Sequence, residues 1–453
     1  MSLARPATDR SQPPPPAALR PFDFPPFHHQ RLANGLRVLA MSMPRVPLVD
    51  LQILVPAGGQ FDAPELPGLA NLHGGLLDEG TARRSSLELA GLVEGLGGSL
   101  GSGAGWNMAY IEAGLLSDHL DRGLELLAEV VRSPGFAPSE LDRTRQRIQA
   151  EILRRKGLPA SLAERFFAAA VYGDTVYGRP LIGTAESLDQ IDRDHLKGFY
   201  DRHVVPDGST LIAVGDLDVD QLMARVEHHL GDWHAAPRPS EPVIEPAKLA
   251  RTEVHIVDRP GSAQTQLLLG HLGVPRSHPD YPQTTLLNAI FGGKFTSRIN
   301  LNLREEHGFT YGAQSSFARR RGPGPFSVRA AVATEVTGAA TEQLLLEMRR
   351  IQQEPVSVEE LRETQDYLVG VFPYTLQTIS DIAKRLEAIA IFDLPSDYYE
   401  HYPAVLGDIS REEVLAAAQR HFDPDHLAII AVGSAEDLRP QLESFGPVLV
   451  HQP

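Results

Sequence analysis

The sequence predicts an α+β protein of two homologous domains, each a mainly antiparallel sheet packed against helices, arranged as a clam-shell. Three observations predict this fold class. A long segment of the 453-residue chain recurs in its second half, and a proline-rich stretch lies between the two halves. Each half also mixes strand-like and helical patterns without strict β-α-β alternation, which favours α+β layers over a doubly wound sheet.

The internal repeat is the first observation. The segment LDQIDRDHLKGFYDRHVVPDGSTLIAVG begins at Leu188, and LGDISREEVLAAAQRHFDPDHLAIIAVG begins at Leu406, an offset of 406 − 188 = 218. The residues of the first copy that recur at this offset include Ile191, Arg193, Arg202, His203, Pro206, Asp207 and Ile212 to Gly215. A weaker echo at an offset of 220 matches Glu140, Leu141 and Thr144 with Glu360, Leu361 and Thr364. The chain therefore reads as one domain used twice.

The elements follow the same order in both halves. Each half opens with β-type runs, which are GLRVLAM and LVDLQILV in the first and TEVHIVD and QTQLLLGHL in the second. After Phe136, PSELDRTRQRIQAEILRRK predicts a helix with Ser139 as its N-cap and with Leu141, Ile148 and Ile152 on one face. Each half closes with a helix, a Pro-Asp turn and a strand that ends in IAVG.

Composition shifts along the chain predict the domain boundaries. Residues 1–26 form a proline-rich tail, and we expect the N-terminal domain over residues 27–235. Residues 236–250 read as a semi-rigid linker because of four prolines, Pro237, Pro239, Pro242 and Pro246. The homologous C-terminal domain follows over residues 251–453.

Overall composition excludes several classes of function. Lys and Arg total 42 against 58 Asp and Glu, a formal charge of −16 that argues against a nucleic-acid partner. The absence of cysteine excludes disulfides, thiolate zinc sites and cysteine nucleophiles. No apolar run predicts a membrane span, and the tail lacks the hydrophobic core of a signal peptide. The chain thus reads as cytoplasmic, with a periplasmic location left open if a leader was removed.

Three segments carry a resemblance to a known family. They are VPAGGQFDAPELPGLANLHGGLLDEGT from Val55, GDW from Gly231 and LREEHGFTYGAQSSF from Leu303. Together they resemble the pitrilysin/insulinase family of zinc peptidases, in particular its smaller bacterial and mitochondrial-processing type. In that family a strand ending in a small residue and glycine precedes a Gly-Leu-Ala helix, which carries the inverted zinc motif H-x-x-E-H and is followed by Gly-Thr.

The sequence departs from the family at the zinc motif itself. Zinc-dependent peptide hydrolysis by this motif needs two imidazoles one helical turn apart and a carboxylate between them as general base. At those positions this chain has Asn71, Gly74 and Gly75, and His73 is on the wrong side of the predicted helix to substitute. The family's remaining carboxylate ligand maps to Glu151, for which a solvated helix carboxylate is the alternative reading. No metal site is therefore expected in this chain.

Other candidate sites are also incomplete. His228 and His229 precede His234, but Gly231 is expected to end the helix, so a solvated surface cluster is the preferred reading. GGKFTS at Gly292 lacks the upstream glycine and the Ser or Thr directly after lysine of a phosphate loop, and reads as a flexible loop.

Two residues of the second half match the family's substrate-holding pair. The resemblance implies that Arg304 clamps peptide backbone or carboxylate and that Tyr311 donates a hydrogen bond to the carbonyl under attack. The alternative is that Arg304 forms a salt bridge with Glu305 or Glu306 while Tyr311 packs at a strand start.

The family also binds substrate as an added strand along a sheet edge of the first domain. The corresponding segment here is Gly97 to Tyr110. Its five glycines would weaken a strand and favour a mobile loop, with an ordinary surface loop as the alternative.

These observations lead to one hypothesis and two alternatives. The first is a non-catalytic, substrate-positioning subunit of a heterodimeric zinc endopeptidase that acts on peptides or unfolded segments. A homologous partner subunit would carry H-x-x-E-H and the zinc, and this chain would hold no cofactor. The alternatives are a structural or interaction protein of the same fold without a proteolytic role, and an independent zinc peptidase with an unrecognised metal site.

Overall fold

The N-terminal domain is built on a six-stranded sheet of order β1-β2-β6-β3-β5-β4. The computed structural model describes residues 23–453. The strands are β1 (His28–Arg31), β2 (Arg37–Ser42), β3 (Leu48–Val55), β4 (Ser99–Ala104), β5 (Ala109–Leu116) and β6 (Thr210–Gly215). Within this sheet β2 and β6 pair in parallel and the other neighbours pair antiparallel.

Helices cover this sheet and extend beyond it. They are α1 (Leu69–Gly74), α2 (Ser86–Gly95), α3 (Leu120–Arg132), α4 (Pro138–Lys156), α5 (Pro159–Tyr172), α6 (Ala185–Gln190), α7 (Arg193–His203) and α8 (Val219–Leu230). Short 3-10 turns connect them at η1 (Gly59–Phe61), η2 (Ser117–His119) and η3 (Val176–Gly178). Helix α4 begins at Pro138 after Ala137, so the prediction of Ser139 as its N-cap was wrong. The proline suits the first helical position, where its missing N–H costs no hydrogen bond.

The C-terminal domain repeats the plan with the sheet order β12-β7-β11-β8-β10-β9. Its strands are β7 (Glu253–Asp258), β8 (Gln264–Leu272), β9 (Ala313–Phe317), β10 (Pro325–Ala333), β11 (Ala428–Gly433) and β12 (Val448–His451). Its α-helices are α9 (Tyr281–Asn288), α10 (Arg298–Asn300), α11 (Thr337–Gln353), α12 (Val358–Val371), α13 (Ile379–Phe392), α14 (Tyr398–Asp408), α15 (Arg411–His421) and α16 (Ala435–Leu442). Two π-helical turns, η4 (Ala289–Gly293) and η5 (Leu301–Glu306), and the 3-10 turns η6 (Thr334–Val336) and η7 (Phe372–Leu376) complete it.

The repeat in the sequence is a repeat in space. Leu51 pairs with Ala213 in the first sheet, and Leu267 pairs with Ala431 in the second, so β6 and β11 hold the same place at an offset of 431 − 213 = 218. Helices α7 and α15 also start and end at this offset. Both begin at a capping residue, Asp192 and Ser410, whose side chain accepts a backbone N–H of the first turn. The two-domain α+β prediction is confirmed.

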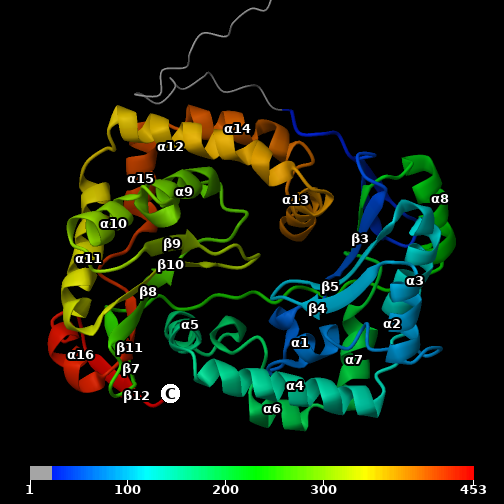
Figure 1. The fold of residues 1–453 in the computed structure, drawn as a ribbon, viewed down its shortest axis with the longest axis horizontal. Helices are drawn as coiled ribbons and strands as arrows, with labels where there is room; N and C mark the ends of the chain where they lie inside the picture. The colour runs from blue at the N-terminus through cyan, green and yellow to red at the C-terminus, as the bar shows by residue number, and fades with distance from the viewer. Residues whose placement is uncertain (1–22) are drawn as a thin grey trace, which may run out of the picture.

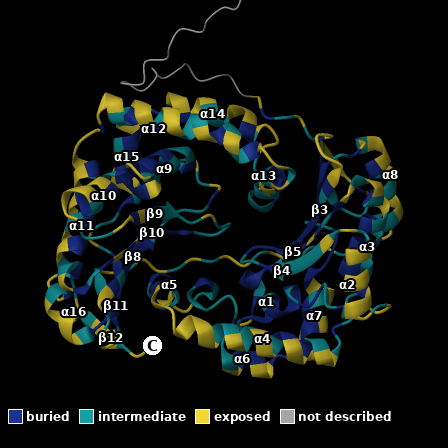
Figure 2. Cartoon of the chain, in the orientation of Figure 1, coloured by how far each residue is buried: buried dark blue, intermediate teal, exposed yellow. Residues whose placement is uncertain are grey.

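One helix of each half packs on the sheet of the other half. Helix α5 belongs to the first half of the chain but packs on strands β8 and β11 of the second sheet, where Leu162 and Phe167 share a buried cluster with Leu268 and Ile430 (Figure 1). Its counterpart α13 packs on β3 and β6 of the first sheet. Burying each large apolar side chain contributes about 1.5–3 kcal/mol, so this exchange ties the two domains firmly together. Figure 2 shows the central strands of both sheets largely buried and the outer faces of the surrounding helices exposed, whereas the edge strands β4 and β9 are only partly buried.

The turn between β9 and β10 adds polar contacts between the domains. The Arg320 guanidinium lies 5.2, 4.9 and 4.4 Å from the ring centroids of Trp106, Tyr172 and Tyr177. Next to it the Arg321 backbone N–H donates to Asn107 Oδ1 at 3.2 Å.

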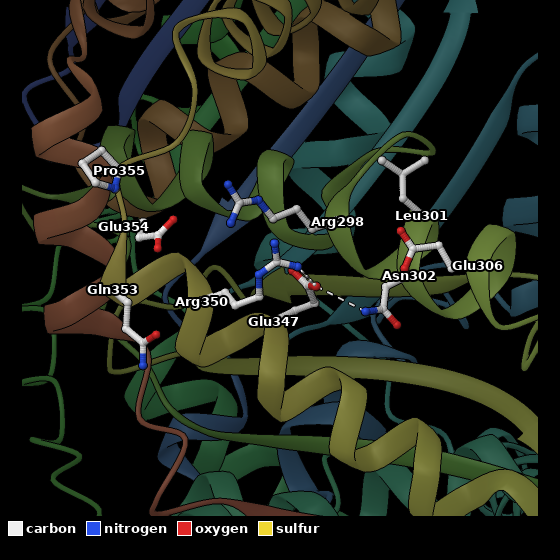
Figure 3. Close-up of a pocket in the computed structure, with 9 residues that line it drawn as sticks. All are labelled: Arg298, Leu301, Asn302, Glu306, Glu347, Arg350, Gln353, Glu354 and Pro355. Atoms are coloured by element: carbon white, nitrogen blue, oxygen red, sulfur yellow. Dashed lines mark hydrogen bonds and ion pairs between the residues drawn. The ribbon is translucent and has the colours of Figure 1, made fainter.

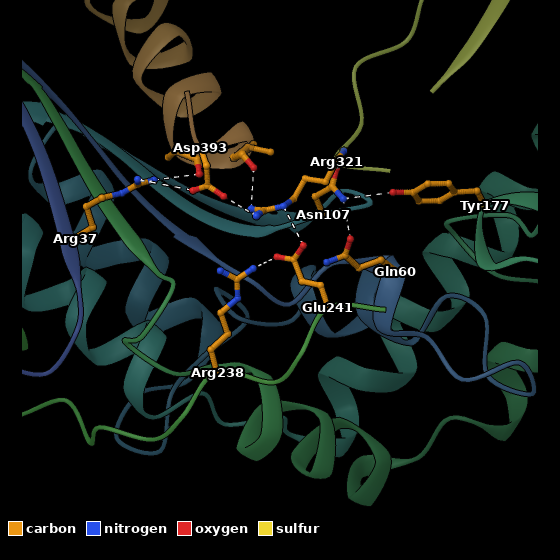
Figure 4. A network of polar contacts seen from close by, with 10 residues as sticks. Arg37, Gln60, Asn107, Tyr177, Arg238, Glu241, Arg321 and Asp393 are labelled. Carbon is orange, nitrogen blue, oxygen red and sulfur yellow. Dashed lines mark hydrogen bonds and ion pairs between the residues drawn. The ribbon is translucent and has the colours of Figure 1, made fainter. Parts of the chain in front are cut away.

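The Arg321 side chain extends this network to the linker. It donates to Asp393 Oδ2 at 2.6 Å and pairs with Glu241 at 3.1 Å, and Glu241 also pairs with Arg238 (Figure 4). The Glu241–Arg321 charge pair therefore holds the linker against the C-terminal domain.

Two expectations from the sequence concern the N-terminal tail and membrane spans. The tail prediction falls mostly on residues 1–22, outside the described residues. Within the remainder Phe24 is buried, with its ring 5.3 Å from that of Tyr399. Among residues 23–453 no helix combines the length and apolar character that crossing a bilayer requires.

Candidate functional site

Helix α1 occupies the place where the family carries its zinc motif. Its start is fixed by Asp62, whose carboxylate accepts the backbone N–H groups of Gly68 and Ala70, each at 2.8 Å. Gly68 itself has a φ of 95°, a left-handed conformation that favours glycine. Burial raises the pKa of Asp62 to about 7 although both backbone hydrogen bonds oppose the rise. The helix is only six residues long and ends with Gly75 as its C-cap.

The two glycines of α1 differ in the space around them. A Cβ on Gly74 would lie 2.6 Å from the carbonyl carbon of Gly103 and 2.8 Å from the Ala104 Cβ in strand β4. The Gly74 carbonyl also accepts the Ser102 hydroxyl at 2.6 Å, which holds helix and strand together. A Cβ on Gly75 would meet nothing closer than 3.4 Å. The position of the family's catalytic glutamate is therefore closed by backbone, and that of the second histidine is open.

His73 points into the core of the domain. Its side chain is fully buried, with ring centroids 5.4 Å from Phe136 and 5.1 Å from Phe199. Among the described residues neither ring nitrogen has a hydrogen-bond partner. Burial, with a smaller contribution from His203, lowers the pKa of His73 to about 3, so the imidazole is neutral at physiological pH.

Glu151 on α4 is held by arginines of its own helix. Its carboxylate accepts hydrogen bonds from Arg154 and Arg155, each at 2.7 Å. These bonds lower the pKa of Glu151 to about 2. This environment matches a solvated helix carboxylate paired with neighbouring cations.

The side chains at these positions do not fit a zinc ion. Zinc in peptidases is bound by three protein ligands, two of them imidazoles in the inverted motif, and glycine offers no ligand atom. Asn71 provides an amide, and Glu151 is engaged by two guanidinium groups. A third cation, Arg147, reaches within 3.9 Å of where a Gly75 Cβ would stand. The departure seen in the sequence is thus also a departure in geometry.

The corresponding turn of the C-terminal domain has the same build. At the offset of 218, LANLHGG from Leu69 aligns with LNAIFGG from Leu287. Phe291 stands in the place of His73 and is also fully buried, against Phe326 and Phe422. A Cβ on Gly292 would lie 2.5 Å from Ser315 Oγ in strand β9, just as Gly74 abuts β4. Sequence reasoning missed this second repeat, although the shared Leu and Gly-Gly spacing was there to find it.

Arg304 lies in the π-helical turn η5, and Tyr311 lies in the short connection between η5 and β9. Tyr311 is 95% exposed, so it does not pack at the strand start as the alternative expected. The Arg304 guanidinium lies 4.3 Å from the Phe295 ring centroid, and its Nε is 3.6 Å from a Glu305 carboxylate oxygen. The ion pair expected in the alternative therefore exists at the long end of the range, and the tyrosine side chain faces solvent.

The turn η5 that carries Arg304 is anchored from behind. Asn302 Nδ2 donates to Gln343 at 3.1 Å and to the buried carboxylate of Glu347 at 3.2 Å. Glu347 in turn accepts from Arg350 at 3.0 Å. Asn302, Glu347 and Arg350 line a polar pocket of about 350 Å³ behind the turn (Figure 3). The backbone beside Arg304 is thereby fixed while its guanidinium stays accessible.

The glycine-rich segment is a strand, so the expectation of a mobile loop was wrong. Residues Ser99–Ala104 form β4, the edge strand of the sheet, paired along their length with β5. Gly101 faces Glu112, and Gly103 faces Tyr110, whose ring fills the space that a Cβ on Gly103 would need. Glycine is needed here because a neighbouring side chain lies across the strand.

Two other expectations concern histidines and a glycine pair. Helix α8 ends at Leu230 with Gly231 as its C-cap, and His229 pairs with Asp121 at 3.1 Å on the surface. The expected loop at Gly292 is partly helical, because Gly292 and Gly293 end the π-helical turn η4. Only the residues from Lys294 onward leave the helix, and the Lys294 ammonium donates to Thr364 at 2.8 Å.

Comparisons with known proteins agree with the motifs and the fold. Residues 37–185 match the family model described as insulinase, peptidase family M16, and residues 190–368 match the one described as the peptidase M16 inactive domain. The chain belongs to the M16 peptidase family. Both of its domains are therefore M16 domains, and the resemblance seen in the sequence is confirmed.

Relatives of this M16 chain span much or nearly all of its length. An uncharacterized zinc protease of Rickettsia felis is 24% identical over 91% of this chain and 98% of its own. An uncharacterized zinc protease of Mycobacterium tuberculosis is 28% identical over 72% of this chain and 73% of its own. A Pseudomonas fluorescens structure described as a peptidase M16 inactive domain superposes with a TM-score of 0.85 at 28% identity, over 90% of this chain and 98% of that one.

Proposed function

We propose that this chain is a non-catalytic, substrate-positioning subunit of a heterodimeric zinc metalloendopeptidase. A homologous partner subunit would carry the intact H-x-x-E-H motif and the zinc, and the substrates would be peptides or unfolded segments. The observation that carries the proposal is the closed space at Gly74, where the helix backbone lies against β4 and leaves no room for a catalytic carboxylate.

Three features of the chain support a role in holding peptide. Strand β4 is a sheet edge, and its backbone can pair with an extended peptide as an added strand. Arg304 has a guanidinium fork suited to peptide carbonyls or a terminal carboxylate. Tyr311 offers an exposed phenol that can donate a hydrogen bond to a carbonyl oxygen as negative charge develops on it.

Reconstitution tests this proposal. The purified chain is mixed with a homologous M16 chain from the same organism that has H-x-x-E-H, and hydrolysis of a quenched fluorescent peptide library is followed. Hydrolysis should require both chains. Tyr311→Phe should lower kcat of the pair by about tenfold to a hundredfold, within the range for a lost oxyanion donor. Tyr374→Phe is the matched control, because Tyr374 is another largely exposed tyrosine, with 70% of its surface accessible.

The alternatives give different results in the same assay. Full activity of pairs containing Arg304→Ala and Tyr311→Phe would favour a structural role without participation in proteolysis. Hydrolysis by this chain alone would favour an independent peptidase.

A further inference from the structure

Three metal-ligating side chains meet in the C-terminal domain, away from α1 and α4. His278 lies in the loop before α9, Asp280 is the N-cap of α9, and His421 is the last residue of α15. One ligand atom from each lies within 4.8 Å of the other two, and among residues 23–453 this is the only such cluster of three. The closest pair is His421 Nε2 and Asp280 Oδ2, at 2.7 Å.

The equivalent positions in the first domain lack this set of three metal-ligating side chains and have structural roles instead. At the offset of 218, the counterparts of His278, Asp280 and His421 are Gln60, Asp62 and His203. There the aspartate carboxylate caps helix α1 by accepting two backbone N–H groups, and His203 packs against the rings of Phe61 and Phe199.

The second domain uses the same positions differently. Asp280 makes no capping hydrogen bond with its side chain, although it is the N-cap of α9. Its carboxylate turns to His421 and Arg420 instead, and a second imidazole replaces the glutamine. The common scaffold therefore does not require this arrangement, because the first domain folds without it.

We propose that His278, Asp280 and His421 form a binding site for a divalent transition metal, with zinc as the ion that the donor set fits best. Two imidazoles and one carboxylate are a common zinc ligand set, with water in the fourth position. Zinc bonds of about 2.0–2.2 Å place tetrahedral ligand atoms about 3.3 Å apart. Side-chain rotation would bring the three ligand atoms, now at most 4.8 Å apart, to this spacing, and the 2.7 Å pair of His421 and Asp280 would open slightly.

Neighbouring groups around His278, Asp280 and His421 affect how strongly the site would bind a metal ion. A ligand imidazole must be neutral, and burial lowers the pKa of His421, although its pairing with Asp280 opposes the fall. His278 Nδ1 accepts the Asp280 backbone N–H at 3.1 Å, which holds its ring beside the aspartate. Arg420 Nε donates to Asp280 Oδ2 at 2.9 Å, orienting the carboxylate but opposing a second cation. His421 also lines a cavity of about 460 Å³, through which water can reach the ion.

Cobalt titration of the full chain, freed of metal by a chelator, tests the site. Tetrahedral Co²⁺ gives a visible absorption band, and the expected result is one Co²⁺ per chain, displaced by Zn²⁺. Asp280→Asn, His278→Gln and His421→Gln should each weaken binding by about tenfold or more. Arg420→Gln should tighten binding, because it removes the competing cation.

The matched control is His229→Gln, which removes another histidine paired with an aspartate, Asp121, on the surface. It should leave Co²⁺ binding unchanged, and circular dichroism of each variant establishes that it is folded. No saturable band in the wild-type chain would overturn the proposal, as would equal losses in His229→Gln and Asp280→Asn. Because the site shares no residue with Arg304, Tyr311 or α1, either result leaves the proposed function to its own test.

Discussion

Helix α1 of the first domain and its counterpart at α9–η4 in the second have the same sequence frame and the same packing. Both end in Gly-Gly, and in both the first glycine lies against the edge strand of its sheet. They differ inside the core, where the first domain buries His73 and the second buries Phe291. In an M16 peptidase the first of these helices would carry the metal.

The comparison teaches that the zinc site has not merely lost its ligands. The backbone of α1 lies so close to the β4 backbone that the glutamate position is closed, and in the second domain the Ser315 side chain of β9 lies equally close to Gly292. Restoring the ligand types by substitution would therefore not restore the site.

The largest expected effect tests that closure. Gly74→Glu should destabilise the chain by about 3 kcal/mol or more, because its Cβ would collide with β4 backbone and its carboxylate would enter a buried space. Urea unfolding measures the loss. Gly75→Ala is the matched control, since its Cβ meets only ordinary contacts and it should change stability by less than about 1 kcal/mol. Equal stability of both variants would show that the helix can move away from the strand.

The next largest effect is expected from exchanging the buried residue that differs between the two helices, His73 in the first domain and Phe291 in the second. His73→Phe should stabilise the chain by about 1–3 kcal/mol, because two buried ring nitrogens without partners are replaced by apolar surface. Phe291→His should destabilise it by a similar amount for the opposite reason. The free energy of unfolding at pH 7.5 measures both, and a destabilised His73→Phe would mean that the site is too tight for the larger ring.

The same residue predicts how stability depends on pH. The pKa of His73 is about 3 in the folded chain, against 6.5 as its ordinary value, and that of His203 is about 4. Below pH 6.5 the unfolded chain binds protons that the folded chain does not, so stability should fall from about pH 6.5 towards pH 3. His73→Phe should make this fall shallower. Parallel pH profiles for the two proteins would contradict the assignment.

The smallest effect is expected at Glu151, the carboxylate at the position of the family's third zinc ligand. Glu151→Gln removes a partly exposed charge that is paired with arginines one turn along the helix. Unfolding and the activity of the reconstituted pair should both stay unchanged. A large loss of activity would assign Glu151 a role that its present contacts do not indicate.

Much of the fold could be predicted from the sequence. The repeat at an offset of 218 indicated the duplication, and the four β-type runs correspond to β2, β3, β7 and β8. The exchange of α5 and α13 between domains could not be predicted, because an apolar helix face indicates burial but not which sheet covers it. Strand β4 was missed for a related reason: its glycines disfavour a strand locally, and the need for glycine at position 103 comes from the Tyr110 ring on the neighbouring strand, which no local pattern reveals.

For the candidate site, the sequence identified which zinc-ligand positions lack ligand side chains. It did not reveal that the backbone leaves no space for a side chain at position 74. The closed space at Gly74 depends on a contact with Gly103 and Ala104, which no local pattern reveals. The core position of His73 could be anticipated only in part, from its place on the helix.

The most direct test of the central claim is peptide hydrolysis by the isolated chain. The purified protein is incubated with a quenched fluorescent peptide library in the presence of Zn²⁺, with and without its H-x-x-E-H partner. Hydrolysis should be absent for the chain alone and appear only with the partner. Turnover by the chain alone that is abolished in Glu151→Ala would contradict the account, because it would place a working metal site at α1 and α4.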